Sequence, residues 1–208
     1  MTPPRPPARY LALGDSYTIG EGLTDPAGRW PAQLVAQLRA TGERIDDAVV
    51  VARTGWTTSD LLAAAPRKAD PAYDLVTVMI GVNNQYRGHR TDRFRRELTD
   101  LLARAVALAG GNAARLVVTS IPDWGASPFA AGRDRAQVAR EIDAYNAVIR
   151  DVLAAHAGAT YVDVTATSRE FAGDRANFTP DGLHYSAVAC ARYAALVLPA
   201  CRKVVAGR

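Results

Sequence analysis

Five short apolar segments recur along this chain, and stretches with helical periodicity separate them. Four of these segments are nearly continuous in valine, leucine and isoleucine, which is typical of strands buried on both faces of a sheet. Strands joined by connections of this length form right-handed crossovers and are therefore parallel. The predicted strands are Arg9–Leu13, Ala48–Ala52, Leu75–Ile80, Leu116–Ser120 and Thr160–Val164.

The segments between these runs carry apolar residues at steps of three and four, which places those residues on one stripe of a helix. One stripe extends from Phe94 to Leu108, and another extends from Val138 to Leu153. A last helix is expected to start at Ser186, a favourable N-cap, and to run toward Pro199. The fold class is therefore α/β, with a parallel sheet covered by helices on both faces.

A single domain accounts for this pattern. The 208 residues suffice for one substantial core, and no linker or internal repeat divides residues 9–208. Residues 1–8 are rich in proline, and we expect them to be flexible. They lack the apolar core of a signal peptide, and no stretch reaches the roughly 18 apolar residues of a membrane span. These features favour a cytoplasmic protein without a membrane anchor.

Charge and cysteine content disfavour several other classes of protein. The formal net charge is +4, but acidic and basic residues are interspersed, so nucleic acid is not the expected partner. Cys190 and Cys201 would lie roughly 16 Å apart on one straight helix, too far for a disulfide, although Pro199 could bend the chain between them. Metal-binding motifs and phosphate-binding glycine loops are absent, so we predict no metal and no cofactor. The sequence does not indicate an oligomeric state.

Two residue patterns suit nucleophilic catalysis. Ser16 stands in a turn between the first predicted strand and a helix start, the position in which a nucleophilic hydroxyl is exposed at a sheet edge. Asp181 precedes His184 by three residues, so its carboxylate can orient the imidazole that accepts the serine proton. Considered separately, Ser16 also fits an ordinary helix N-cap, and Asp181 also fits a cap beside a packed histidine.

Two further residues could stabilise an oxyanion. Asn83 follows the third predicted strand and has a side-chain amide that can donate a hydrogen bond. Gly55 follows the second strand and offers a backbone N–H without a side chain in the way. Each also fits an ordinary turn residue. Since the carboxyl ends of parallel strands share one edge of the sheet, we expect Ser16, Gly55 and Asn83 to meet there.

The four patterns together resemble the sequence blocks of the SGNH (GDSL-like) hydrolases, in the same order and over nearly the whole chain. The resemblance implies a flavodoxin-like three-layer α/β/α sandwich around a five-stranded parallel sheet. It also implies Ser16 as nucleophile and first oxyanion donor, Gly55 and Asn83 as the other donors, His184 as general base and Asp181 as its orienting carboxylate. Asn84 stands where the family usually has aspartate, and Tyr17 where it usually has leucine; neither belongs to the implied catalytic set. The matching blocks are Gly14-Asp15-Ser16, Gly55, Gly81-Val82-Asn83-Asn84 and Asp181-Gly182-Leu183-His184.

The sequence thus predicts a serine hydrolase that cleaves small-molecule carboxylic esters through an acyl-enzyme, either a short-acyl esterase or a carbohydrate deacetylase. A lysophospholipase or thioesterase for longer acyl chains remains an alternative, because the loops after the strands declare no acyl length. A catalytically silent carbohydrate- or lipid-binding module on the same fold is another, although every catalytic position is filled. A flavodoxin-like nucleotide or flavin binder is disfavoured by the missing phosphate loop.

Large side chains after the strands are candidates for substrate contact. The aromatic residues could form a sugar platform or an acyl groove, and equally could pack within their own loops. Arg87, close to Asn83, could place a polar or anionic part of the substrate, and equally could belong to a solvated cluster of arginines. The predicted substrate-binding residues are Trp56, Tyr86, Arg87, Trp124 and Phe129.

Overall fold

A five-stranded parallel sheet forms the centre of the molecule in the computed structural model, which describes residues 5–208. The strand order is β2-β1-β3-β4-β5, the doubly wound order of flavodoxin-like folds, so the predicted fold is confirmed. Every predicted strand is present, with ends within two residues of those expected. The strands are β1 (Tyr10–Gly14), β2 (Val49–Ala52), β3 (Leu75–Met79), β4 (Leu116–Thr119) and β5 (Thr160–Val162).

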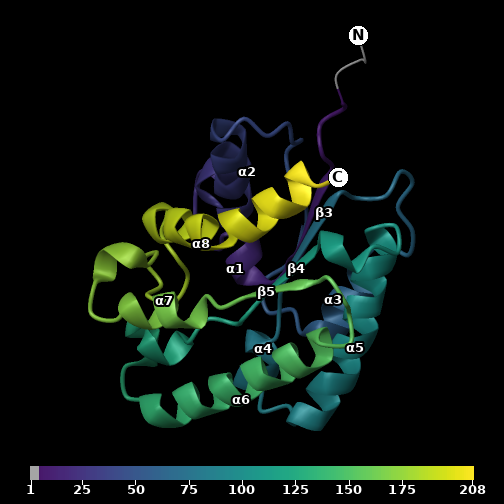
Figure 1. Cartoon of the computed structure of the whole chain (residues 1–208). Coiled ribbons are helices and arrows are strands. Elements are labelled where there is room, and N and C mark those ends of the chain that lie inside the picture. Colours follow the sequence, from purple (N-terminus) through teal and green to yellow (C-terminus); the bar gives the residue numbers. More distant parts are fainter. Residues whose placement is uncertain (1–4) are drawn as a thin grey trace.

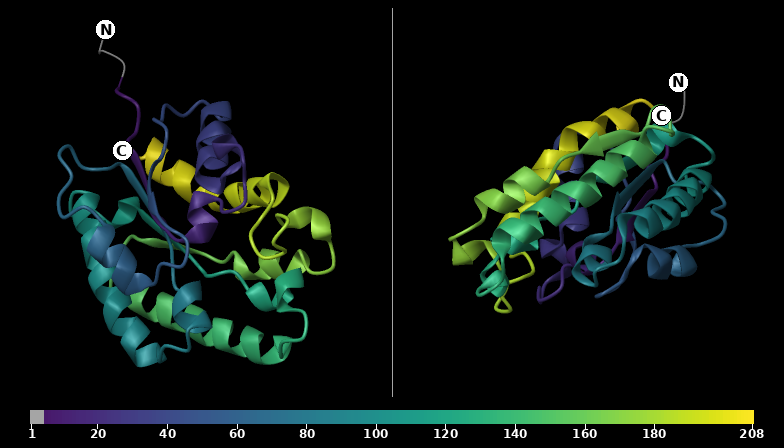
Figure 2. Two further views of the ribbon diagram at one scale, coloured as in Figure 1. Left: turned by 180° about the vertical axis from the view of Figure 1, so that it is seen from behind. Right: turned by 90° about the horizontal axis from the view of Figure 1, so that it is seen from below.

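Helices cover both faces of the sheet and complete three layers, as Figures 1 and 2 show. The layer on one face consists of α1 (Ser16–Ile19), α2 (Trp30–Ala40) and α8 (Ala187–Ala206), the last two packed together. The other layer contains α3 (Thr58–Ala64), α5 (Thr91–Leu108) and α6 (Arg135–Leu153), with α5 between the other two. Two short helices, α4 (Val82–Tyr86) and α7 (Thr165–Glu170), follow the ends of β3 and β5.

The central strands are fully buried, and the edge strands are not. Every residue of β1, β3 and β4 is buried, because these strands have a neighbour on each side and helices above and below. The valine run of β2 does not reach the burial that such a run predicts, since β2 borders only β1. Val49 at its start is 47% exposed.

The last helix is longer than the sequence predicts. We expect it to end near Pro199, but α8 continues to Ala206 with the proline in its interior. A proline inside a helix costs roughly 3 kcal/mol, and burial of Val197, Cys201 and Val205 on both sides of it offsets this cost.

Cys190 and Cys201 lie on this one helix and are both free thiols. Burial raises the pKa of each to about 12.

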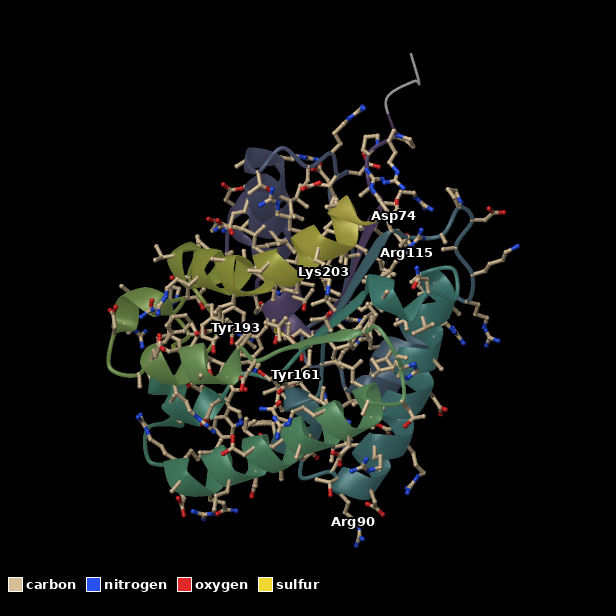
Figure 3. The ribbon with its side chains drawn as sticks, viewed as in Figure 1. Asp74, Arg90, Arg115, Tyr161, Tyr193 and Lys203 are labelled. Carbon is tan, nitrogen blue, oxygen red and sulfur yellow. The ribbon has the colours of Figure 1, made fainter. Side chains whose placement is uncertain are left out.

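The amino-terminal end of the sheet is held by an ion cluster. Asp74 accepts a hydrogen bond from the Arg9 backbone N–H at 3.0 Å and pairs with Arg115 at 3.6 Å. Figure 3 shows Asp74 and Arg115 together at one end of the molecule, with Arg90 at the opposite end.

Of the proline-rich segment 1–8, residues 1–4 lie outside the described residues, whereas Ala8 is buried and bridges to Ile45. Within residues 5–208, no helix has the length and apolarity to cross a membrane.

The carboxyl end of β1 depends on a close backbone approach at Gly14. A Cβ on this residue would stand 2.0 Å from Thr18 Oγ1 in the following helix and 2.8 Å from the carbonyl oxygen of Met79. Met79 is the residue of β3 that pairs with Gly14 in the sheet register. The missing side chain therefore lets α1 begin immediately after β1 and brings Ser16 to the sheet edge.

Replacing Gly14 with alanine tests this close approach. We expect Gly14→Ala to lower the free energy of unfolding by about 3 kcal/mol or more, because the Met79 backbone cannot move away without disturbing β3. The matched control is Gly42→Ala, where a Cβ meets nothing within 4 Å and only a positive φ of 89° opposes the change, at about 1–2 kcal/mol. Urea unfolding of both variants measures the difference, and equal losses would show that the contact with β3 is unimportant.

Candidate active site

Ser16 is the first residue of α1 and follows β1 after a one-residue turn. The side chain of Asp15 caps this helix by accepting a hydrogen bond from the Tyr17 N–H at 3.1 Å. The Ser16 N–H has no acceptor among residues 5–208, as expected for a group in the first turn of a helix. Ser16 is buried at 4% exposure but lines a pocket.

The side chains of His184 and Asp181 contact each other in the turn before α8. The imidazole Nδ1 lies 2.6 Å from Asp181 Oδ2. Asp181 Oδ1 accepts hydrogen bonds from the backbone N–H groups of Leu183 and His184 at 2.8 and 3.0 Å, and from the Thr179 hydroxyl at 2.8 Å. Burial opposes ionisation of Asp181, but these hydrogen bonds, led by that of His184, outweigh it and lower its pKa to about 2. The carboxylate is therefore ionised and accepts the Nδ1 proton, which leaves Nε2 as the basic nitrogen.

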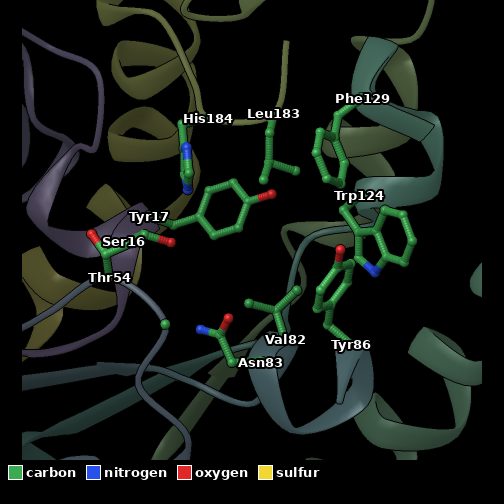
Figure 4. Close-up of a pocket in the computed structure, with 11 residues that line it drawn as sticks. Ser16, Tyr17, Thr54, Val82, Asn83, Tyr86, Trp124, Phe129, Leu183 and His184 are labelled. Atoms are coloured by element: carbon green, nitrogen blue, oxygen red, sulfur yellow. The ribbon is translucent and has the colours of Figure 1, made fainter. Parts of the chain in front are cut away.

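The turn that holds this pair is fastened to neighbouring elements. Its Gly182 carbonyl accepts a hydrogen bond from the Phe129 N–H at 3.0 Å, which links it to the loop after β4. The Tyr17 ring lies against the imidazole of His184, with 5.3 Å between the ring centroids. Figure 4 shows the side chains of Ser16 and His184 directed toward the same end of the pocket.

Asn83 borders that end of the pocket from the opposite side (Figure 4), and Gly55 also lines the pocket. The Gly55 N–H has no acceptor among residues 5–208. Asn83 Nδ2 donates one hydrogen bond to the Trp56 carbonyl at 3.0 Å, and an amide nitrogen has a second N–H to give. Ser16, Gly55 and Asn83 thus line one pocket with N–H groups that can stabilise a developing negative charge.

The rest of the pocket is apolar. Its volume is about 180 Å³, and its far wall consists of Val82, Tyr86, Trp124, Phe129 and Leu183. Three of these are aromatic neighbours, with ring centroids 5.2 to 6.4 Å apart. Trp124 is fixed by a hydrogen bond of 2.7 Å from its Nε1 to Gln85 Oε1. The pocket can therefore place an apolar group next to the polar end that contains Ser16 and His184.

The structure separates the predicted substrate-binding residues into two groups. Tyr86, Trp124 and Phe129 line the pocket. Trp56 and Arg87 do not line it: the Trp56 side chain packs against the core, and the Arg87 guanidinium donates a hydrogen bond to the Gly55 carbonyl at 2.6 Å. Trp56 and Arg87 thus lie close in sequence to Gly55 and Asn83, but their side chains contact the core and the Gly55 carbonyl and do not line the pocket.

Four lining residues were not predicted from the sequence. Tyr17, Thr54, Val82 and Leu183 each stand next to a motif residue, and that adjacency is the only sequence signal that could have found them. No cluster of histidine, cysteine, aspartate or glutamate within residues 5–208 could hold a metal ion.

Comparisons with known proteins agree with this arrangement. The model of the GDSL-like Lipase/Acylhydrolase family matches residues 12–191, which is most of the chain. No curated protein matches the sequence significantly. Among solved structures, TesA is 24% identical with a TM-score of 0.74, and the match covers 94% of this chain and 99% of that one.

Two further solved structures share the fold. The lipase/acylhydrolase from Enterococcus faecalis is 21% identical with a TM-score of 0.72, covering 94% of this chain and 95% of its own. Axe2, an acetylxylan esterase from Geobacillus stearothermophilus, is 18% identical with a TM-score of 0.66, covering 96% and 94% respectively. Because these three proteins are less than 25% identical to this chain, their structural similarity shows a shared fold and no more.

The carboxyl group of Asp15, next to Ser16, has an environment opposite to that of Asp181. It is 1% exposed and accepts a hydrogen bond from the Tyr17 N–H. Burial raises the pKa of Asp15 from 3.8 to about 7, against the opposing effect of that hydrogen bond. Between about pH 4 and pH 7 the folded state therefore holds a proton that the unfolded state releases, and stability falls as the pH rises through this range.

Asp15→Asn removes this titration while keeping an oxygen that can cap α1. We expect the variant to gain stability relative to wild type, on the order of 3 kcal/mol, as the pH rises from 4 to 8. Thermal unfolding of both proteins across this pH range measures the difference. Asp25→Asn, at an exposed aspartate that caps Pro26–Gly28 in the same way, is the matched control. A stability difference for Asp15→Asn that does not change with pH would contradict the prediction.

Proposed function

This chain belongs to the GDSL-like lipase/acylhydrolase family and is thereby a hydrolase of carboxylic esters, and we propose that it works as a serine esterase with Ser16 as nucleophile. The observation that carries the proposal is the convergence on one pocket of the Ser16 hydroxyl, the Asp181-bound His184 and the donors of Gly55 and Asn83. A nucleophile, an oriented base and oxyanion donors are the groups that acyl transfer requires.

The first step forms an acyl-enzyme. Ser16 Oγ attacks the ester carbonyl carbon while His184 Nε2 accepts the hydroxyl proton, and Asp181 stabilises the resulting imidazolium. The carbonyl oxygen becomes an oxyanion that accepts hydrogen bonds from the N–H groups of Ser16 and Gly55 and from Asn83 Nδ2. The tetrahedral intermediate then collapses: the bond to the alcohol oxygen breaks, and His184 returns the proton to the leaving alcohol.

The second step releases the acid by the same groups. Water attacks the acyl carbon as His184 Nε2 accepts its proton, and the oxyanion forms again at the same donors. Collapse of this intermediate breaks the bond to Ser16 Oγ, and His184 reprotonates the serine. The products are one carboxylic acid and one alcohol, and the enzyme returns to its starting state.

Pocket size supports a short acyl group. At about 180 Å³ the pocket is small, which suits an acyl chain of a few carbons. An acetylated sugar is also a suitable substrate for this pocket, because the exposed rings of Tyr86 and Phe129 provide flat apolar surfaces for a sugar ring. The fold likeness to an acetylxylan esterase makes sugar acetates a natural class to test.

Longer acyl chains are the second candidate substrate class. Tyr86 is 50% exposed and Phe129 is 41% exposed, so apolar surface continues from the pocket to the outside of the molecule. A fatty acyl chain could leave the pocket along these rings, as a lysophospholipase or thioesterase would require. The two classes differ in the chain length at which turnover is greatest.

A series of p-nitrophenyl esters from acetate to palmitate, hydrolysed by wild type and by Ser16→Ala, tests the proposal. We expect the greatest kcat/KM for acetate or butyrate, and loss of nearly all turnover in the variant, because the Ser16 hydroxyl forms the acyl-enzyme in this mechanism. Greatest turnover at long chains would move the assignment to the second class. Wild-type rates in Ser16→Ala would refute the mechanism, and absence of Ser16-dependent turnover on every ester would favour a binding module.

Asn83→Ala tests the third oxyanion donor. We expect kcat to fall about 10²–10³-fold with a smaller change in KM, because the donor acts mainly on the charge of the transition state. Asn112→Ala, at an asparagine that caps a short turn ahead of β4 and outside the pocket, is the matched control and should retain activity. A kcat within about threefold of wild type in Asn83→Ala would exclude this residue from the oxyanion site.

A further inference from the structure

The Gly55 N–H lies in the central peptide of a β-turn, a group whose direction is easily reversed. The Trp56 N–H donates to the Arg53 carbonyl at 3.2 Å and closes the turn. Gly55 has a φ of +79° at the third position. The common turn types differ chiefly in the orientation of the peptide between the second and third residues, and glycine at the third position permits both orientations. A flip of this peptide would point the Gly55 N–H away from the pocket.

Helix α4 contacts this turn and the start of α3 through the side chains of Asn83 and Asn84 and through Arg87, the residue that caps its carboxyl end. Arg87 Nη2 donates to the Gly55 carbonyl at 2.6 Å, and Asn83 Nδ2 donates to the Trp56 carbonyl at 3.0 Å. Asn84 Oδ1 accepts from the Thr58 N–H at 3.0 Å. Three backbone groups between positions 55 and 58 are thus bound by one helix, and the contact to Gly55 itself comes from Arg87.

These side chains are themselves anchored. Asn84 is fully buried and donates to Glu97 Oε2 at 3.2 Å, and Glu97 pairs with Arg93 at 2.7 Å on α5. Asn84 stands where the family usually has an aspartate, and the carboxylate next to it comes from Glu97. Arg87 lies 4.0 Å from Asp60, the carboxylate of the capping box at the start of α3.

The other flank of the turn is also held. Thr54 is the residue before the central peptide, and its hydroxyl donates a hydrogen bond to the carboxylate of Glu21. Arg87 binds the residue after it. These two contacts hold the residues on either side of the peptide that carries the Gly55 N–H, and so fix the position of its two ends.

We propose that Arg87 is a positioning residue of the oxyanion site, which acts through the Gly55 carbonyl to keep the Gly55 N–H directed at the pocket. The proposal rests on the proposed function above. Glycine is the residue type with the greatest backbone freedom, so the precision that an oxyanion donor requires must come from outside the residue. Arg87 supplies it from a helix, and its absence from the pocket lining separates this role from substrate contact.

The test compares Arg87→Ala, Arg87→Met and Arg87→Lys with wild type on p-nitrophenyl acetate. We expect kcat to fall about 10–100-fold in the first two variants, with KM changed less than about threefold, because misdirection of one donor weakens the transition state and not substrate binding. Methionine keeps the apolar stem and removes the donor, so it reports on the hydrogen bond if the alanine variant does not fold. Lysine keeps a cationic donor and should restore part of kcat.

A second readout follows the oxyanion directly. Diethyl p-nitrophenyl phosphate reacts with an active-site serine to give a tetrahedral adduct whose phosphoryl oxygen occupies the oxyanion site. Its inactivation rate should fall in parallel with kcat in Arg87→Ala and Arg87→Met. Arg90→Ala, which removes a neighbouring arginine that is 85% exposed and pairs with Asp92, is the matched control and should leave both rates unchanged.

The possible results separate this proposal from the proposed function. An unchanged kcat in Arg87→Met, in an enzyme that Ser16→Ala inactivates, would overturn the positioning role and leave the esterase mechanism standing. A raised KM with unchanged kcat would show that Arg87 contacts substrate instead, which also overturns the proposal. Equal losses of kcat and of folded protein in all three variants, lysine included, would mean that Arg87 serves only the stability of the fold.

Discussion

Parallel pairing of β1 with β2 on one side and β3 on the other is the constraint on which the candidate site depends. Gly14 at the end of β1 pairs with Ala52 of β2 and with Met79 of β3, so the three strands end at the same level. Their following segments begin with Ser16, the turn of Gly55 and the helix of Asn83 respectively. The chain is wound in opposite directions on the two sides of β1, which leaves a crevice above these strand ends. The missing Cβ of Gly14 allows α1 to start within it.

Polar groups around this crevice are held by contacts that differ in kind. The environments of the Asp15 and Asp181 carboxylates shift the pKa in opposite directions: burial raises that of Asp15 against one hydrogen bond, whereas four hydrogen bonds lower that of Asp181. Only Asp181 is held ionised well below neutral pH, which suits its proposed partnership with His184. The loop that carries Gly55 is held from α4 and its C-cap residue Arg87, whose side chains bind backbone groups of Gly55, Trp56 and Thr58.

The fold and the family could be predicted from the sequence because each rests on local information. Apolar runs such as Leu75–Met79 specify buried strands, and the order of the motif blocks specifies the family, which the family model confirms. The roles of Ser16, Gly55, Asn83, Asp181 and His184 stay predictions, and the structure brings all but Asp181 to the pocket lining, with Asp181 bound to His184 behind it. Trp56 and Arg87, which the sequence predicts to contact substrate, lie outside the pocket lining, since proximity in sequence to a motif does not give the direction of a side chain.

The sequence by itself determined the alternation of strands and helices, the strand ends at which reactive side chains occur and the family to which they belong. These follow from periodicity, turn residues and motif spacing, which act over a few residues at a time. Only the tertiary structure decided which side chains line the pocket, that α8 continues through Pro199, and that Arg87 binds the Gly55 carbonyl. Those outcomes depend on contacts between segments far apart in the chain, such as the 32 residues between Gly55 and Arg87. Whether such groups meet is set by how the helices pack on the sheet, and no local pattern of residues records that packing.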